Sequence, residues 1–220
     1  MPEIYCLNCH KSIREEGTFL EMFYVDDVLC KTCRSKMTRY VKTINLDGLQ
    51  VEGLYLYSDL VRDLIIQYKE YKDEALFPLF LWKDIKRLKK KYKDYVIVCL
   101  PSSQQASHQR GFDHVKLMFE MLDLEMVDVL YKSQDIFQKQ MKLSQRKDIG
   151  KYLRIKDEWR IEGKKVLLVD DIITSGETIK AADKLVSQYA KEVKGLVISY
   201  NTRYLNQFEK IFIRTLLTAD

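Results

Sequence analysis

The chain has 220 residues, which is long enough for one substantial hydrophobic core and a small additional module. Hydrophobic residues make up 46% of it and charged residues 31%, as in ordinary globular proteins. No apolar run approaches the roughly 20 residues that span a bilayer, and the start MPEIYCLNCH lacks the basic and apolar stretches of a secretory signal. We therefore expect a cytoplasmic protein without a membrane span, whose cysteines stay reduced.

The formal net charge of +5 is unevenly distributed along the chain. Residues 1–47 hold seven Lys/Arg and seven Asp/Glu, so the basic excess lies in residues 48–220. Two stretches are strongly basic: residues 83–94 hold seven basic and two acidic residues, and residues 139–165 hold ten and four. Such runs are typical of a solvated helix face, and they also suit a polyanion such as nucleic acid or a substrate phosphate. Both interpretations stay open.

Four of the five cysteines form two CxxC pairs near the start of the chain. They are Cys6 with Cys9 and Cys30 with Cys33, and 20 residues separate the two pairs. Each pair can supply two thiolates to one metal ion, and the spacing is typical of zinc ribbons. We therefore expect structural zinc, which would supply the folding energy of a small module over residues 1–45. His10 is an alternative ligand, but the tetrahedral set is complete without it.

Beyond the cysteines, the pattern of apolar residues predicts helices that alternate with short strands. The predicted elements in chain order are a helix or connection at 34–45, a strand at 51–57, helices at 60–71 and 73–91, a strand at 95–100, a helix at 112–122, a strand at 126–131, an irregular excursion at 132–160, a strand at 166–169, a helix at 178–189 and a strand at 195–200. This alternation predicts an α/β domain with a parallel sheet over residues 46–220.

The stretch VLLVDDIITSGET, residues 166–178, carries the strongest functional signal. The buried strand Val166–Val169 is followed at its carboxyl end by two carboxylates and then by a hydroxyl-rich turn that opens a helix. Ligands of open α/β sheets bind beyond the carboxyl ends of strands, and helix N-termini present unpaired N–H groups to anions. Carboxylates suit sugar hydroxyls or a magnesium ion that carries phosphate oxygens. The predicted sugar-phosphate site comprises Asp170, Asp171, Thr174, Ser175, Gly176, Glu177 and Thr178.

The hydroxyl-rich turn and the acid pair also suit two different roles. Thr174 or Ser175 can simply be the N-cap of the helix, which is worth roughly 1 kcal/mol. The two acids can also form the magnesium site of a receiver domain, in which the rest of the sheet follows the acids. Only 42 residues follow Thr178, too few for that arrangement.

The same stretch resembles the phosphoribosyl pyrophosphate motif of type I phosphoribosyltransferases, in which two acids and a Thr/Ser-Gly-x-Thr loop follow a hydrophobic strand. A four-cysteine module in front of such a domain narrows the resemblance to the ComF family, in particular its ComFC-like competence proteins. Three further stretches are similar to that family: Pro101 with Arg110-Gly111-Phe112-Asp113, Gln140 to Arg146 with a shortened spacing, and Tyr68-Lys69 with Tyr71-Lys72-Asp73. The resemblance implies a type I phosphoribosyltransferase-like parallel sheet flanked by helices and preceded by a small zinc-ribbon-like module.

The resemblance also implies roles for single residues. Asp170 and Asp171 would contact the ribose hydroxyls or the magnesium ion bound with them. The residues implied to hold the 5′-phosphate are Thr174, Ser175, Gly176 and Thr178, and Glu177 would donate its N–H while its carboxylate points away. A side chain at Gly176 would block the approach of the backbone to the phosphate. If the chain transfers phosphoribosyl groups, the pyrophosphate needs a cradle, for which the candidates are Ser102, Ser103 and Arg110.

The function implied by the resemblance is natural transformation: cytosolic handling of incoming single-stranded DNA beside a helicase-like ATPase from the same operon. Recombination mediators would be further partners, and the protein would be recruited to the inner face of the membrane at the DNA uptake machinery. The alternative is an active phosphoribosyltransferase of nucleotide metabolism, for which no residue identifies an acceptor. The zinc module would dock onto its own domain or the helicase-like partner, with DNA as a second choice.

Overall fold

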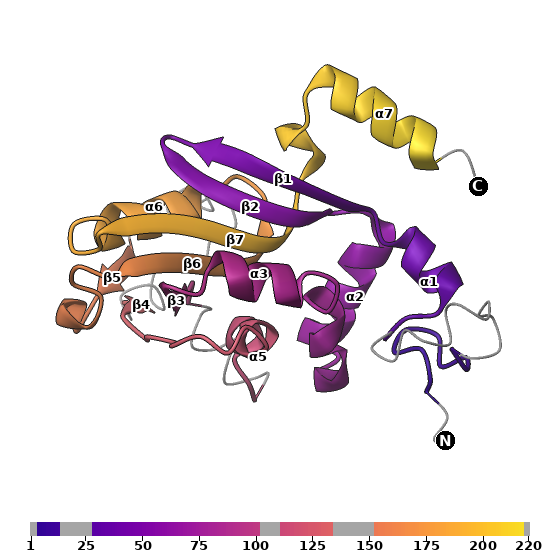
Figure 1. The fold of residues 1–220 in the computed structure, drawn as a ribbon, viewed down its shortest axis with the longest axis horizontal. Helices are drawn as coiled ribbons and strands as arrows, with labels where there is room; N and C mark the ends of the chain where they lie inside the picture. Colours follow the sequence, from indigo (N-terminus) through magenta and orange to yellow (C-terminus); the bar gives the residue numbers. More distant parts are fainter. Residues whose placement is uncertain (1–3, 14–27, 102–110, 134–151, 218–220) are drawn as a thin grey trace, which may run out of the picture.

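The computed structural model describes residues 4–13, 28–101, 111–133 and 152–217. Within these residues the centre is a five-stranded sheet in the order β1-β2-β7-β6-β3 (Figure 1). The strands are β1 (Arg39–Leu46), β2 (Leu49–Leu56), β3 (Tyr95–Cys99), β6 (Lys165–Ile173) and β7 (Glu192–Tyr200). β1 and β2 form an antiparallel hairpin, whereas β2, β7, β6 and β3 pair in parallel. The predicted α/β fold with a mostly parallel sheet is confirmed.

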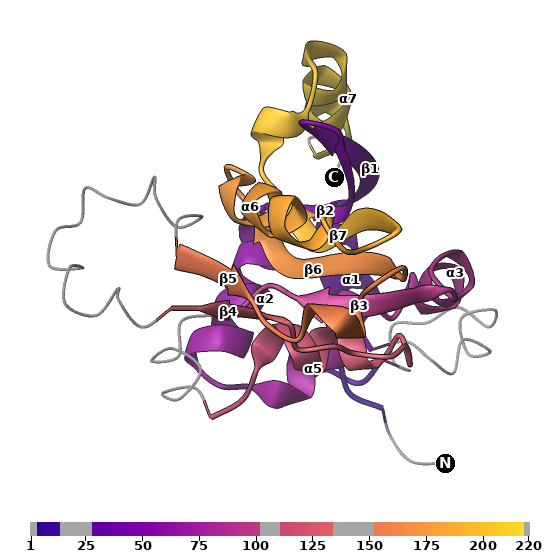
Figure 2. The same cartoon turned by 90° about the vertical axis from the view of Figure 1, so that its left-hand side faces the viewer.

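Helices and short 3₁₀ turns (η) surround the sheet. They are α1 (Lys31–Lys36), α2 (Asp59–Glu70), η2 (Glu74–Phe80), α3 (Ile85–Lys91), α5 (His114–Glu120), η5 (Glu158–Arg160), α6 (Glu177–Val186), η6 (Thr202–Tyr204) and α7 (Gln207–Leu217). α7 lies beyond β1 at one end of the molecule, and α5 lies near β3 at the other (Figures 1 and 2). None of the described helices has the length and apolar character needed to cross a membrane.

The interior strand β6, which lies between β7 and β3, is apolar on both faces. Leu167 and Val169 belong to one hydrophobic cluster, which includes residues of α2 and α5, whereas Val166 and Leu168 belong to another, which includes residues of α6. Because successive side chains of a strand point to opposite faces, this division shows that β6 is covered on both sides. Burial on both faces explains why the strand has no polar alternation.

The prediction for residues 34–45 is wrong, because most of them form β1. Ile44 and Leu46 are buried, and the residues between and before them are more exposed, which is the alternation of a strand covered on one face. Asp47 and Gly48 form the tight connection to β2 and both have positive φ, at 53° and 103°. Asp-Gly is a strong hairpin signal.

The predicted single helix at 73–91 is also wrong. The chain forms η2, which contains Pro78, and then starts α3 at Ile85 with Asp84 as its N-cap residue. Proline has no N–H to donate and its ring clashes with the carbonyl of the preceding turn, so a continuous α-helix is disfavoured here.

The predicted strand at 126–131 is only partly present. Met126 makes an isolated bridge to Ile97, and β4 (Leu130–Lys132) begins later and pairs with β5 (Leu153–Ile155). β5 lies within the stretch 132–160, which is predicted as irregular, so this strand is missed. Residues 134–151 of that stretch lie outside the described residues.

Candidate functional site

The two acids lie within strand β6 rather than after it. β6 continues to Ile173 because β7 supplies hydrogen-bond partners that far, with Asp170 opposite Val197. On its other side the pairing with β3 ends at Val169, opposite Cys99. The acids therefore lie beyond the carboxyl end of β3, at the edge of the sheet where ligands of parallel sheets bind.

A tight turn joins β6 to α6. Thr174 and Ser175 are exposed, and Gly176 has a positive φ of 80° and occupies the N-cap position without a capping side chain. The alternative that Thr174 or Ser175 is the N-cap residue is therefore wrong. Glu177 and Thr178 open the helix, and the Glu177 carboxylate lies 2.6 Å from Lys180 Nζ. Its side chain is thus engaged on the helix. The N-cap residue Gly176 has no side chain to cap the first turn, and the Glu177 N–H donates a hydrogen bond to Ser175 Oγ at 3.4 Å.

Gly176 is confined by neighbours from two other elements. A Cβ atom at this position would lie 3.0 Å from Leu46 Cδ1 and 3.2 Å from the Tyr204 hydroxyl oxygen. That hydroxyl donates a hydrogen bond to the Thr174 carbonyl oxygen at 3.1 Å. The left-handed conformation and this close packing both favour glycine here.

Asp171 is held by side chains from two helices. The residue is 5% exposed, and its Oδ2 forms an ion pair with Lys69 of α2 and lies 3.3 Å from His114 Nε2 of α5. Burial alone would raise the pKa of Asp171, but the hydrogen bond from His114 and the charge of Lys69 outweigh it and lower that pKa below its ordinary value. Asp171 is therefore ionised and paired within the protein.

Asp170 is in a different electrostatic environment. Burial, and then the neighbouring charge of Asp171, raise the pKa of Asp170 well above its ordinary value. Its Oδ1 accepts a hydrogen bond from the Asp171 backbone N–H at 2.9 Å. Lys132 of β4 is half-buried; burial lowers the pKa of its ammonium group, whereas the charge of Asp170 raises it. The two adjacent acids are thus not equivalent.

Two contributors to this site were not assigned from the sequence. Lys69 belongs to a stretch that resembles the ComF family, but nothing in the sequence connects it to Asp171, which lies 102 positions further on. His114 follows the Arg-Gly-Phe-Asp stretch and carries no signal of its own. The predicted pyrophosphate residues Ser102, Ser103 and Arg110 lie outside the described residues.

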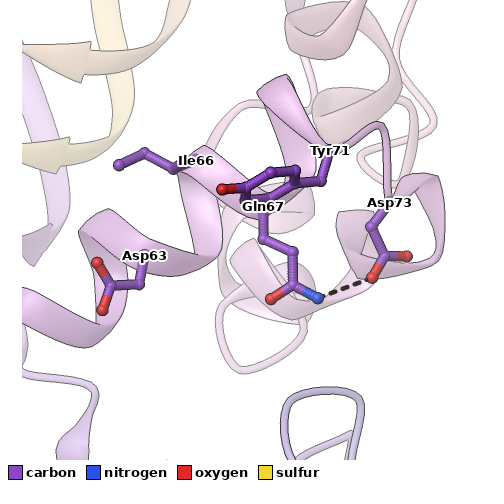
Figure 3. A pocket seen from close by; sticks show the side chains of 5 residues that line it. All are labelled: Asp63, Ile66, Gln67, Tyr71 and Asp73. Carbon is purple, nitrogen blue, oxygen red and sulfur yellow. Dashed lines mark hydrogen bonds between the residues drawn. The ribbon is translucent and has the colours of Figure 1, made fainter.

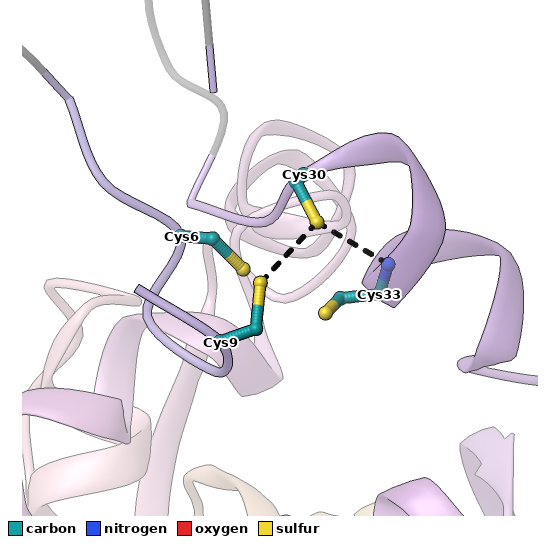
Figure 4. Close-up of side chains that lie close together, drawn as sticks. All are labelled: Cys6, Cys9, Cys30 and Cys33. Atoms are coloured by element: carbon teal, nitrogen blue, oxygen red, sulfur yellow. Dashed lines mark hydrogen bonds between the residues drawn. The ribbon is translucent and has the colours of Figure 1, made fainter. Parts of the chain in front are cut away.

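The four cysteines meet as predicted (Figure 4). The Sγ atoms of Cys6, Cys9, Cys30 and Cys33 all lie within 4.8 Å of one another. The distance from Cys9 Sγ to Cys30 Sγ is 3.7 Å, and a tetrahedral zinc ion with bonds of about 2.3 Å places its sulfur ligands about 3.8 Å apart. His10 is not part of the cluster found among the described residues. The arrangement fits a closed metal site with four sulfur ligands.

A pocket on α2 has neither of the acids of β6 in its lining (Figure 3). It is lined by Asp63, Ile66, Gln67, Tyr71 and Asp73. Gln67 Nε2 donates a hydrogen bond to Asp73 Oδ2 at 3.0 Å, so part of its polar surface is satisfied internally. Two carboxylates without a cation in the lining disfavour a phosphate, so this pocket is not the predicted sugar-phosphate site.

Comparison with known proteins shows the family of this chain. Residues 81–216 match the model of the phosphoribosyl transferase domain. The competence protein ComFC of Streptococcus pneumoniae is 28% identical over 217 residues, which cover 86% of this chain and 96% of that protein. The competence protein ComFC of Bacillus subtilis is 23% identical over 219 residues, with coverages of 86% and 91%.

Solved structures resemble the chain more distantly. The adenine phosphoribosyltransferase of Saccharomyces cerevisiae is 17% identical and covers 80% of this chain and 93% of its own, with a TM-score of 0.39. A TM-score of that size is too low to bear on the geometry of the site.

Proposed function

Because the chain belongs to the phosphoribosyl transferase domain family, we propose that its site at the end of β6 binds phosphoribosyl pyrophosphate together with Mg²⁺. The supporting observation is that two acids at the carboxyl edge of a parallel sheet lead directly into the N-terminus of α6, whose N-cap residue Gly176 has no capping side chain. Backbone N–H groups and the helix dipole at such an end attract phosphate. The acids suit the ribose hydroxyls or the metal ion.

The proposed contacts to the ligand come from three segments of the chain. The acids Asp170 and Asp171 would lie on the ribose side of the ligand, and the turn would hold the 5′-phosphate through Thr174, Ser175, Gly176, Glu177 and Thr178. The pyrophosphate would be held by Ser102, Ser103 and Arg110, from the segment that follows β3. Mg²⁺ would neutralise pyrophosphate oxygens when it is bound with the ligand.

Replacing Asp170 by Asn tests this site. Loss of a charge-assisted hydrogen bond is worth about 1.5–3 kcal/mol, so we expect binding of phosphoribosyl pyrophosphate with Mg²⁺ to weaken roughly tenfold to hundredfold, as measured by titration calorimetry. Asp183→Asn on α6 is the matched control, because the Asp183 carboxylate accepts a hydrogen bond from Ser187 on the same helix at 2.7 Å. An unmodified chain that fails to bind the ligand would refute the proposal. Release of labelled pyrophosphate in the same samples distinguishes transfer from binding alone.

We further propose that the chain acts in natural transformation and handles incoming single-stranded DNA in the cytoplasm with a helicase-like ATPase and a recombination mediator. The support is the name of the two relatives and the basic face of α3, where Lys86 and Lys90 make no ion pair with another described residue. A deletion strain should lose transformation and regain it with the natural gene. Transformation that is unaffected by the deletion would refute this role.

We propose zinc as the metal of the cysteine cluster, because four thiolates are a typical structural zinc set. Three of the four cysteines, Cys6, Cys30 and Cys33, share a hydrophobic cluster with residues of α2 that include Val61, Leu64 and Tyr68. These contacts favour docking of the module onto its own domain.

A further inference from the structure

Asp171 is held on the side of β6 that faces α2 and α5. Its side chain is 7% exposed, and those of Lys69 and His114 are 22% and 4% exposed. Both groups approach the same carboxylate oxygen, Oδ2. Breaking a buried ion pair leaves each charged group without a partner, which costs free energy. A ligand that bound Asp171 in place of Lys69 would therefore also have to neutralise the Lys69 ammonium group.

The two partners of Asp171 are themselves fixed by packing. The Tyr68 hydroxyl donates a hydrogen bond to the His114 carbonyl oxygen at 3.0 Å and so ties α2 to the first residue of α5. The Tyr68 ring lies 5.4 Å from that of Phe80 and 5.3 Å from that of Phe112. Tyr68 therefore holds both partners of Asp171 in place: Lys69 is the next residue in the chain, and His114 accepts the hydrogen bond from its hydroxyl.

Charge balance gives this arrangement a consequence for the ligand. A phosphorylated sugar is strongly anionic, and two uncompensated carboxylates beside the phosphate turn would repel it. The ammonium of Lys69 cancels the charge of Asp171. Among the described residues Asp170 makes no ion pair, and part of its surface is exposed to solvent. One acid is therefore internally neutralised, and the other is available to hydroxyl groups.

We propose that the two acids have different tasks: Lys69 and His114 are positioning residues that hold Asp171 inside the protein, while Asp170 contacts the ribose hydroxyls. This division of roles rests on the proposed sugar-phosphate function, because it concerns the same site. It departs from the expectation that both acids contact the ribose.

Binding of phosphoribosyl pyrophosphate with Mg²⁺ to three variants tests the proposal. Lys69→Met leaves the charge of Asp171 uncompensated and should weaken binding about tenfold or more. Asp171→Asn should change the affinity by less than about threefold, because Asp171 does not contact the ligand. Lys69→Met combined with Asp171→Asn should return the affinity to within about threefold of the natural chain. Lys69→Arg keeps a cation at this position and should bind within about threefold of the natural chain. If Lys69→Met misfolds, Lys69→Arg still tests whether a positive charge at this position supports binding.

The opposite pattern would overturn the proposal. If the double variant binds as weakly as Lys69→Met, Lys69 contacts the ligand itself. If Asp171→Asn weakens binding as much as Asp170→Asn, both acids are ligands. Arg62→Met is the matched control on α2, because Arg62 pairs with exposed Asp63 at 3.2 Å.

Thermal unfolding without ligand separates this proposal from the proposed function. Both single variants should melt below the natural chain, and the double variant should melt above Lys69→Met, because the buried carboxylate is then no longer charged. Absence of that recovery refutes the pairing even if the ligand binds. Recovery in a chain that binds no phosphoribosyl pyrophosphate refutes the ligand and leaves the pairing intact.

Discussion

At Gly176 the sequence gives only part of the reason why the position requires glycine. The sequence suggests that glycine lets the backbone approach a phosphate. The structure adds a left-handed φ of 80° and the contacts with Leu46 and Tyr204 that a Cβ would make. Neither neighbour can be inferred from the sequence, because Leu46 and Tyr204 come from distant parts of the chain. The requirement for glycine at this position was predictable from the sequence, but the packing around it was not.

Gly176→Ala should destabilise the fold and weaken binding of phosphoribosyl pyrophosphate. Alanine in the left-handed region costs about 1–2 kcal/mol, and the contacts at 3.0 and 3.2 Å add to it. Gly163→Ala carries only the cost of the left-handed conformation, because Gly163 has φ 66° but nothing within 4 Å of an added Cβ. Urea unfolding should show a larger loss of stability for Gly176→Ala. Equal losses would show that the close packing is unimportant.

Among the elements, those with strong local signals were predicted best. The strand at β3 and the helix at α2 lie close to their predicted bounds, because β3 is a short continuous apolar run and α2 has apolar residues at helical spacing. The length of β6 was underestimated, since its last residues pair with β7, and such long-range partners leave no mark on a local pattern. The same reason explains why β5 was not predicted, since it has only three residues and its partner is β4. The cysteine cluster was fully predicted, because ligand spacing is itself a sequence property.

Loss of the metal should unfold the cysteine module and expose the surface of α2 that it covers. Cys30→Ser should lower both the zinc content and the thermal unfolding temperature, because a structural metal contributes directly to folding. Cys99→Ser is the control, since Cys99 belongs to β3 rather than to the cluster. Metal analysis and thermal unfolding of the two variants provide the measurement. A Cys30→Ser chain that keeps one zinc per molecule would contradict the four-thiolate site.

At the scale of the whole molecule, a cluster of buried charges joins β1, β2 and α3. Asp84 is 1% exposed and lies 2.7 Å from Arg39 and 2.8 Å from Arg87, and Glu52 lies 2.6 Å from Arg87. Burial would raise the pKa of both acids, but hydrogen bonds from Arg39 to Asp84 and from Lys91 to Glu52 lower it. Their ionised forms therefore stabilise the fold.

These lowered pKa values predict acid sensitivity. Because the folded values lie below the ordinary values of 3.8 for Asp84 and 4.5 for Glu52, the stabilisation is fully present above about pH 5 and is lost as the pH falls toward 3. The urea midpoint should decrease over this range, and it should decrease less in Asp84→Asn. A midpoint that stays constant from pH 6 to pH 3 would contradict this prediction.

The strand order also determines when the sheet can be completed during synthesis. Leu56 at the end of β2 and Glu192 at the start of its neighbour β7 are 136 positions apart. Ribosomes add roughly 5–20 residues per second, so the β1–β2 hairpin waits on the order of ten seconds for β7. Throughout that interval the nascent chain exposes an unpaired strand edge, which is a template for pairing with other chains. In the finished sheet β7 pairs with this edge of β2, so we expect aggregation through this edge during translation rather than in the folded chain.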